Sequence, residues 1–255
     1  MGFQIAYKTD IGNAKDVNQD GLLIKTARAK EKDVAFLCVC DGMGGLSDGE
    51  MASTCVICAM SDWFDKSLPG LMGSENFEED VKRDLSRVVE SANSRLNAYG
   101  IRHNIQLGTT CTAVLVVEDE YIGIHVGDTR LYEIMNSVQQ ITEDQTVLAR
   151  EIALGRVSTQ DAKNDSRASI LLQCIGAAGQ VQPAFVKNKI SRGSMLMLCS
   201  DGFRNKVDEF EMFEGFRPKY MTDPRTMEKQ CEYFTELAKQ RGERDNITVL
   251  VAKLI

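Results

Sequence analysis

The sequence predicts an α+β fold, a layered sandwich in which antiparallel strands are covered by long helices. Ten short runs have strand character, and several are separated only by a turn. Parallel strands would need crossovers of a dozen or more residues, so these runs favour hairpins and meanders. Two long stretches with helical periodicity interrupt the series early, and a third follows late.

Three strands are predicted before the first helix: Phe3–Lys8, Gly21–Thr26 and Val34–Cys40. The third run contains no hydrogen-bonding side chain stronger than a thiol, so we expect it to be fully buried. Asp41 follows it, and three of the next four residues are glycines. That ending suits either a tight turn or a site where a cation contacts both the carboxylate and the backbone.

Two helices are predicted next. The first begins at a capping box formed by Ser47 and Glu50. The second runs from about Ser74 to Tyr99, with Gly100 as its C-terminal cap. Each carries one apolar stripe. The stripes are Ala52, Cys55, Val56, Ala59, Met60 and Trp63 in the first helix, and Phe77, Val81, Leu85, Val88, Ala92 and Leu96 in the second.

The chain after residue 110 supplies the other seven strands and a helix over about Pro224–Arg241. The segment Glu143–Ser169 is polar, and we expect a surface excursion with short helical pieces. No linker rich in Pro, Gly or Ser divides the chain, so residues 1–255 are predicted to form a single domain. The strands are Cys111–Val117, Tyr121–Val126, Arg130–Met135, Val138–Thr142, Gln182–Ile190, Met195–Ser200 and Ile247–Leu254.

Composition narrows the class of protein. The 255 residues carry a net charge of −7, which does not attract a phosphate backbone and argues against nucleic acid as a partner. No apolar run approaches a membrane span, and the first residues lack a signal-peptide pattern. We therefore expect a cytoplasmic protein without a membrane partner, and a monomer.

The eight cysteines suit that compartment. Cys55 and Cys58 form a C-x-x-C, but no second pair has zinc spacing, so we interpret them as two helix positions. Five others lie in apolar runs, where cysteine acts as a small buried hydrophobe. These five are Cys38, Cys40, Cys111, Cys174 and Cys199.

Four aspartates mark the ends of apolar strands: Asp41, Asp128, Asp201 and Asp245. Asp-Gly is a strong hairpin signal, yet neither Asp-Gly here is followed by a strand-like run. If the strand ends converge, the carboxylates need a cation to stay ionised together, and oxygen ligands select Mg²⁺ or Mn²⁺. Two such ions can activate a water for in-line attack on phosphorus.

The motifs that contain these aspartates resemble one family, the metal-dependent (type 2C) serine/threonine protein phosphatases. They are TDIG and NQD near residues 9–20, VCDGMGG, GEMAS, GTTCTA, HVGDTRLY, ITED, CSDGF and DNIT. The resemblance spans residues 5 to 254, and the DGMGG and HVGDTR forms are similar to the bacterial branch. His125 and Arg130 lie in one of these motifs, and we interpret both as structural.

The resemblance implies a four-layer α-β-β-α sandwich of two antiparallel sheets flanked by helices. It also implies an Mn²⁺- or Mg²⁺-dependent phosphatase that hydrolyses phosphoserine and phosphothreonine by direct attack of a metal-bridging hydroxide. Two core ions are expected, with a third possible. The partners would be phosphoproteins, including a serine/threonine kinase.

Transferred residue by residue, Asp41 would bridge the two ions and Gly42 would offer its carbonyl. Asp201 and Asp245 would complete the first metal site. Asp128, with Asp201, would hold the weaker third ion.

Four further positions acquire expected roles. Asp20 would act beside the ions, partly through waters, and Lys15 would bind the substrate phosphate. Asn246 and Gln19 would support the ligands from behind. The segment Glu143–Ser169 matches the variable flap beside the family's active site.

Three positions depart from the family pattern. Lys15 stands where an arginine is usual, and lysine binds phosphate without the bidentate fork. Gln19 replaces a glutamate, which removes one negative charge from the site. Met43 stands where some members have a histidine proposed as the general acid. Lys15 and Gln19 keep an alternative open: a catalytically weak relative that acts as a phosphoprotein-binding scaffold.

Overall fold

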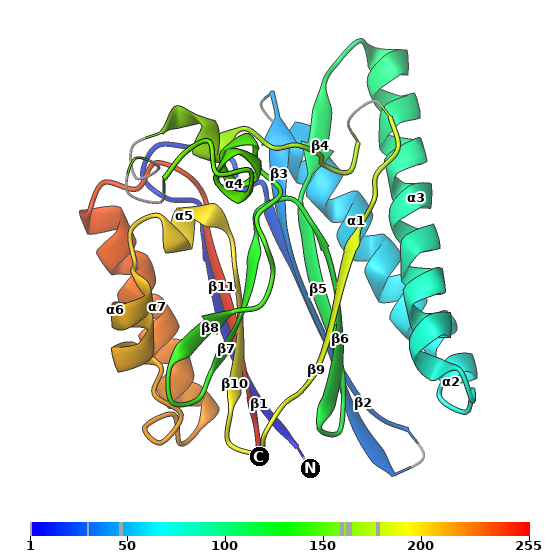
Figure 1. The fold of residues 1–255 in the computed structure, drawn as a ribbon, viewed down its shortest axis with the longest axis vertical. Coiled ribbons are helices and arrows are strands. Elements are labelled where there is room, and N and C mark those ends of the chain that lie inside the picture. The colour runs from blue at the N-terminus through cyan, green and yellow to red at the C-terminus, as the bar shows by residue number, and fades with distance from the viewer. Residues whose placement is uncertain (1, 30, 46–47, 159–160, 162–164, 177–178) are drawn as a thin grey trace.

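Two antiparallel sheets pack face to face, and helices cover both outer faces (Figure 1). The computed structural model describes all residues except 1, 30, 46–47, 159–160, 162–164 and 177–178. The predicted four-layer α-β-β-α sandwich is therefore confirmed. No described helix is long and apolar enough to cross a membrane.

The first sheet holds the two ends of the chain side by side. β1 pairs with β11 over its whole length, from Phe3 opposite Leu254 to Asp10 opposite Ile247. Its strand order is β1 (Phe3–Asp10), β11 (Ile247–Leu254), β10 (Met195–Cys199), β7 (Arg130–Ile134) and β8 (Val138–Gln140).

The second sheet is built around one long strand, β3 (Lys32–Gly44), which bonds to both of its neighbours. A short strand, β4 (Leu107–Thr109), pairs with the last residues of β3. The order of the other strands is β2 (Asp20–Ala29), β3, β5 (Cys111–Val117), β6 (Glu120–Val126) and β9 (Ala184–Lys189).

The helices lie on the outer faces and at the upper edge of the sandwich (Figure 1). On the second sheet lie α1 (Asp48–Lys66), α2 (Leu68–Leu71) and α3 (Phe77–His103). On the first sheet lie α6 (Glu209–Gly215) and α7 (Pro224–Gln240), and at the edge α4 (Val147–Ala153) and α5 (Asp201–Arg204).

Both faces of β3 are buried, which explains its unbroken apolar run. Phe36, Cys38 and Cys40 belong to the core beneath α1 and α3. Leu37 and Val39 belong to the core between the sheets. Successive side chains of a strand point to opposite faces, so one run of residues fills two cores.

Several predicted boundaries are wrong. β3 does not end before Asp41 but continues to Gly44, because β4, which was not predicted, offers it a further partner. Gly100 is a buried residue inside α3, and the helix ends at His103, with Asn104 as its C-cap in the left-handed conformation (φ 54°). α6 was also not predicted. The predicted cap residue Ser47 lies outside the described residues.

Candidate active site

The predicted aspartates meet at one end of the sandwich. Asp20 and Asp41 lie directly opposite each other in the β2–β3 pair. Asp201 begins α5 two residues after the end of β10, and Asp245 lies two residues before β11. The structure thus brings together residues from both sheets, as expected for strand ends that converge.

Two glycines let the backbone close up around this cluster. A Cβ on Gly42 would lie 2.1 Å from the Gly49 carbonyl oxygen and 2.6 Å from that of Gln19. A Cβ on Gly202 would lie 2.1 Å from the carbonyl oxygen of Asn246. The requirement for glycine after each aspartate is therefore steric. Gly42 allows β3 to approach α1, and Gly202 allows α5 to approach Asn246, the residue before β11.

The carboxylates destabilise one another's charged forms. Burial, with the charges of Asp20, Asp201, Asp128 and Asp245, raises the pKa of Asp41 well above its usual range. Burial also raises the pKa of Asp20 to about 7, against the hydrogen bonds that stabilise its carboxylate. Such a group of acids holds protons or cations at neutral pH.

Two carboxylate oxygens indicate that the cluster binds a cation and not only protons. Asp20 Oδ2 accepts a 2.8 Å hydrogen bond from Ser200 Oγ, but its Oδ1 is buried without a partner among the described residues. Asp201 Oδ1 is also buried without a partner among the described residues. Buried oxygens without donors, in an all-oxygen ligand set, fit Mg²⁺ or Mn²⁺. The residues present therefore fit the two core ions that the family resemblance implies.

Asn246 and Gln19 join the two sheets behind the cluster. Asn246 Oδ1 accepts from Gln19 N at 2.8 Å, and Asn246 Nδ2 donates to the carbonyls of Ile11 (2.9 Å) and Val17 (3.1 Å). The carbonyl of Gln19 accepts from Gly42 N at 3.2 Å. These bonds tie the loop that carries Lys15 to β3, which carries Asp41, and to the segment before β11, which carries Asp245.

Lys15 supplies a cation at the open side of the cluster. Its Nζ lies 2.8 Å from Asp245 Oδ1, and both side chains are 40% exposed. Partial burial opposes its charged form, yet the hydrogen bond to Asp245 and the charges of Asp41 and Asp201 raise the pKa of Lys15. It is therefore a positive charge within reach of an arriving anion.

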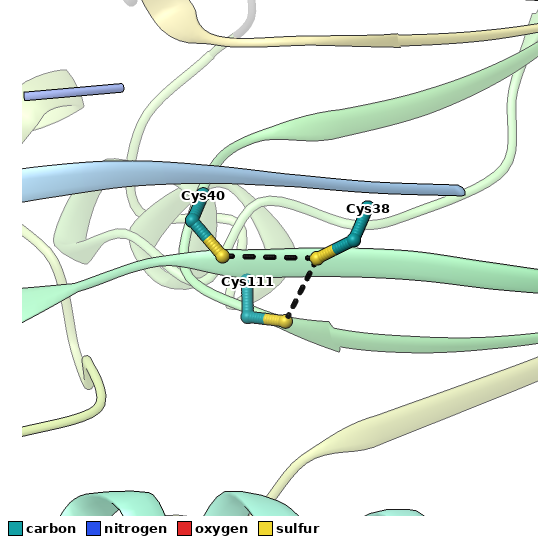
Figure 2. A group of neighbouring side chains, drawn as sticks. All are labelled: Cys38, Cys40 and Cys111. Atoms are coloured by element: carbon teal, nitrogen blue, oxygen red, sulfur yellow. Dashed lines mark hydrogen bonds between the residues drawn. The ribbon is translucent and has the colours of Figure 1, made fainter. Parts of the chain in front are cut away.

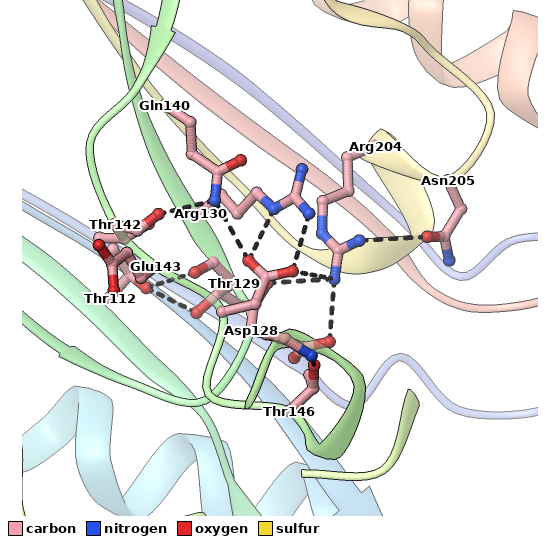
Figure 3. A network of polar contacts seen from close by, with 12 residues as sticks. Thr112, Asp128, Thr129, Arg130, Gln140, Thr142, Glu143, Thr146, Arg204 and Asn205 are labelled. Carbon is pink, nitrogen blue, oxygen red and sulfur yellow. Dashed lines mark hydrogen bonds and ion pairs between the residues drawn. The ribbon is translucent and has the colours of Figure 1, made fainter. Parts of the chain in front are cut away.

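Asp128 lies beside the cluster but already has a cation partner (Figure 3). Arg204 Nη2 donates to Asp128 Oδ2 at 2.9 Å and lies 3.7 Å from Asp144 Oδ2. Both Arg204 and Asp128 are nearly buried. Sequence reasoning missed Arg204, although a residue three positions after Asp201 on α5 must share its side of the helix.

The expectation that Arg130 and His125 are structural agrees with their contacts. Arg130 forms a bidentate pair with Asp144, with both N–O distances 2.7 Å. His125 Nε2 donates to the carbonyl of Glu143 at 3.0 Å, and its Nδ1 contacts Thr112 Oγ1 at 2.9 Å. Burial lowers the pKa of His125, so the ring is neutral at pH 7 and acts as a bridge.

The flap begins at this network and carries the predicted short helices. Gln145 N donates to the carbonyl of Gly127, and Gly127 N donates to Gln145 Oε1. α4 and a 3-10 turn over Ser166–Ser169 follow, with residues 159–160 and 162–164 outside the described part. A groove of about 840 Å³ runs between the flap and the residues around Arg130 and Arg204.

The family described as Protein phosphatase 2C matches residues 13–241 of the chain. A serine/threonine phosphatase, stp, of Listeria innocua is 31% identical over 252 residues, which cover 97% of this chain and 94% of the relative.

Solved structures with the same fold include bacterial phosphatases. The serine/threonine phosphatase of S. agalactiae superimposes with a TM-score of 0.83 at 26% identity, over 100% of both chains. The catalytic domain of the phosphatase PstP, in complex with two manganese ions, superimposes with a TM-score of 0.78 at 26% identity. That match covers 98% of this chain and 97% of the other.

Proposed function

The chain belongs to the protein phosphatase 2C family and is a serine/threonine phosphatase, and from that premise we propose that it uses two Mn²⁺ or Mg²⁺ ions to hydrolyse phosphoserine and phosphothreonine. The observation that carries the metal requirement is the cluster itself. Buried aspartates face one another, and Asp20 and Asp201 each leave one oxygen without a donor among the described residues. The manganese ions of the related PstP domain support the same choice of cofactor.

We propose that Asp41 contacts both ions, with the Gly42 carbonyl, Asp201 and Asp245 as further ligands. Asp20 lies opposite Asp41 and is held by Ser200, so it is placed to orient a water beside the ions. Asn246 and Gln19 hold these residues in place through their hydrogen bonds. When bound, the ions supply Lewis-acid charge and an activated water for in-line attack on phosphorus.

The chain's own residues then bind and orient the phosphate. Lys15 is the exposed cation next to Asp245, so we propose that it exchanges this partner for a phosphate oxygen of the substrate. Attack is direct, with no phosphorylated enzyme residue. A phosphorylated side chain trapped during turnover would contradict this step.

We propose that the substrates are phosphoproteins, including a serine/threonine kinase, and that the flap at about 143–169 contributes to their choice. The groove between the flap and Arg204 adjoins the carboxylate cluster through Asp128, which supports this assignment. The further proposals are a single domain over residues 1–255, a monomer and a cytoplasmic location. A core of buried residues drawn from strands of both sheets supports the single domain.

The proposed activity is tested by phosphate release from a phosphothreonine peptide after chelation and after readdition of Mn²⁺. We expect release only with the ion present. A folded protein that binds the phosphopeptide but releases no phosphate at any Mn²⁺ concentration would instead support the scaffold alternative, and would point to Lys15 and Gln19 as its cause.

Lys15→Arg is expected to lower KM for a phosphopeptide by about fivefold, the equivalent of about 1 kcal/mol, with kcat changed little. Arginine offers two parallel N–H donors to a phosphate, whereas lysine acts as a point charge. Steady-state kinetics at saturating Mn²⁺ measure the change. Lys25→Arg, the same exchange at the surface pair with Asp65, is the matched control and should leave KM unchanged. An unchanged KM in Lys15→Arg would remove Lys15 from the phosphate site.

We propose Asp128 as a ligand of a weaker third ion, and Arg204 as its competitor for that carboxylate. Arg204→Thr removes the guanidinium 2.9 Å from Asp128 Oδ2. We therefore expect the weakest Mn²⁺ site to tighten by about tenfold, or about 1.4 kcal/mol. Calorimetric titration with Mn²⁺ measures this without reference to activity. Arg241→Thr, which breaks a surface pair with Glu211, should not alter binding, and an unaltered Arg204→Thr titration would refute the competition.

A further inference from the structure

Three thiols meet in the core beneath α1, outside the carboxylate cluster (Figure 2). Cys38 Sγ lies 3.7 Å from Cys40 Sγ and 3.7 Å from Cys111 Sγ. All three sulfurs lie within 4.8 Å of one another, and all three side chains are fully buried. From here on we call these three residues the thiol triangle.

The register of two strands builds the thiol triangle. Cys38 lies opposite Ala113 in the β3–β5 pair, so Cys111, two residues before Ala113, lies beside Cys40 on the same face. In the described part of the chain, the hydrogen bonds of these thiols run only among themselves. No fourth carboxylate, imidazole or thiol among the described residues joins the group.

The spacing suits one central atom. Bonds of about 2.3 Å, the usual zinc–thiolate length, place sulfurs roughly 3.8 Å apart at tetrahedral angles, and somewhat closer at the narrower angles of a pyramidal trivalent centre. The two distances of 3.7 Å are already close to that value. A soft atom can therefore be bound with little movement of the strands, and a three-sulfur set selects thiophilic elements.

The net charge of the three thiolates and the bound atom distinguishes between thiophilic chemical elements. Three thiolates around Zn²⁺ leave one negative charge, and around a cuprous ion they leave two. A trivalent metalloid leaves none. A buried charge without a partner is costly, and Asp41, directly after Cys40, adds a carboxylate nearby. The neutral product is therefore the one that this apolar site can hold.

We propose that the thiol triangle binds a trivalent, thiophilic metalloid of the class of arsenous acid. The reaction is a condensation, As(OH)₃ + 3 RSH → As(SR)₃ + 3 H₂O. Three As–O and three S–H bonds break, three As–S bonds and three O–H bonds form, and arsenic remains trivalent. No oxidant or reductant takes part.

The thiol triangle is coupled to the carboxylate cluster through the backbone. Cys111 follows Thr110, whose Oγ1 accepts from Asp41 N at 2.9 Å and whose N donates to the Asp41 carbonyl at 2.9 Å. Ligation of Cys40 and Cys111 to one atom would therefore act on both strands that position Asp41. Loss of phosphatase activity on metalloid binding rests on the proposed function, whereas binding itself does not.

Binding should be slow, because the sulfurs are covered and α1 must open locally before a ligand can enter. Low, non-denaturing urea concentrations should accelerate it. The C-x-x-C of α1 is a competing pair near the surface, where Cys58 is exposed and Cys55 partly exposed. The test therefore uses a parent protein with Cys55→Ser and Cys58→Ser.

The experiment is native mass spectrometry of this parent after incubation with arsenous acid, combined with arsenic X-ray absorption. We expect one arsenic per chain, a mass that shows loss of three waters, and three sulfur neighbours. Cys38→Ala and Cys111→Ala, each made in the parent, should bind none at the same concentration or retain a hydroxyl on a two-sulfur arsenic. Cys231→Ala, at a buried cysteine in the core between α7 and the first sheet, is the matched control and should bind as the parent does.

Circular dichroism melts show which variants fold, and two independent triangle variants keep the test decisive if one does not. Full three-sulfur binding in a folded Cys38→Ala or Cys111→Ala protein would overturn the proposal. So would a parent that takes up no arsenic even when refolded in its presence. Tighter binding of Zn²⁺ than of arsenic at these cysteines would overturn the charge argument. The mass readout needs no phosphatase activity, so failure of the proposed function would remain distinguishable.

Discussion

Asp41→Asn is expected to abolish Mn²⁺-dependent phosphate release, with a loss of at least about 10³-fold. A cation that polarises phosphoryl oxygens stabilises the transition state by several kcal/mol, and each 1.36 kcal/mol off the activation free energy raises the rate tenfold. Asn is isosteric but cannot hold two divalent ions as a carboxylate does. Phosphate release from a phosphothreonine peptide, across a range of Mn²⁺ concentrations, measures the loss.

The same variant should be more stable than the wild type in the absence of metal. Burial and the charges of Asp20, Asp201, Asp128 and Asp245 raise the pKa of Asp41, so the ionised cluster opposes folding. A neutral amide removes that repulsion, and we expect Tm to rise by roughly 2–4 °C in chelator, the equivalent of about 1 kcal/mol. Mn²⁺ should then stabilise the variant less than the wild type.

A surface exchange of the same kind separates the two effects. Asp62→Asn, on the exposed side of α1 and paired with Lys66, should change neither activity nor the effect of Mn²⁺ on Tm. If Asp41→Asn kept more than about a tenth of wild-type turnover, the assignment of Asp41 to the ions would be wrong. If it lost activity and also melted lower in chelator, Asp41 would be structural.

Gly42→Ala is expected to destabilise the fold by about 3 kcal/mol, the upper end of the cost of overpacking. The new Cβ would lie 2.1 Å from the carbonyl oxygen of Gly49 and 2.6 Å from that of Gln19. Both neighbours are backbone atoms, so no side chain can rotate away. For a chain of this length the cost corresponds to a fall in Tm of roughly 6–12 °C.

Urea denaturation of Gly42→Ala and Gly70→Ala tests this prediction. At Gly70, in α2, a Cβ would meet no heavy atom within 4 Å, so its exchange should raise the free energy of unfolding, by about 0.4–1 kcal/mol. Metal affinity should fall in Gly42→Ala as well, because α1 and β3 must separate where the Gly42 carbonyl faces Gly49. Equal stability of the two variants would show that the approach of α1 to β3 is not tight.

The elements that the sequence predicted best are those with the strongest local pattern. Cys111–Val117 and Ile247–Leu254 were predicted with both boundaries as observed. These continuous β-branched and apolar runs show no helical periodicity, and turn residues mark their boundaries. β4 was missed because three residues, one of them glycine, carry no period.

The sequence proposed the residues of the candidate site, and it indicated their geometry only in part. Four aspartates at strand ends, two followed by glycine, indicated a shared carboxylate site before any pairing was known. The structure adds that Asp20 lies opposite Asp41, that Ser200 holds Asp20, and that Arg204 already occupies Asp128. None of these contacts follows from periodicity, because each joins segments distant in sequence.

The sequence by itself determined the fold class, the family and the identity of the acidic residues, because composition, period and motif order are local properties of the chain. Only the tertiary structure decided which groups touch. The three cysteines of the thiol triangle were interpreted correctly as buried hydrophobes, yet their mutual approach depends on the register between β3 and β5, some 70 residues apart. Register is set by non-local pairing between strands, and a linear pattern does not contain it.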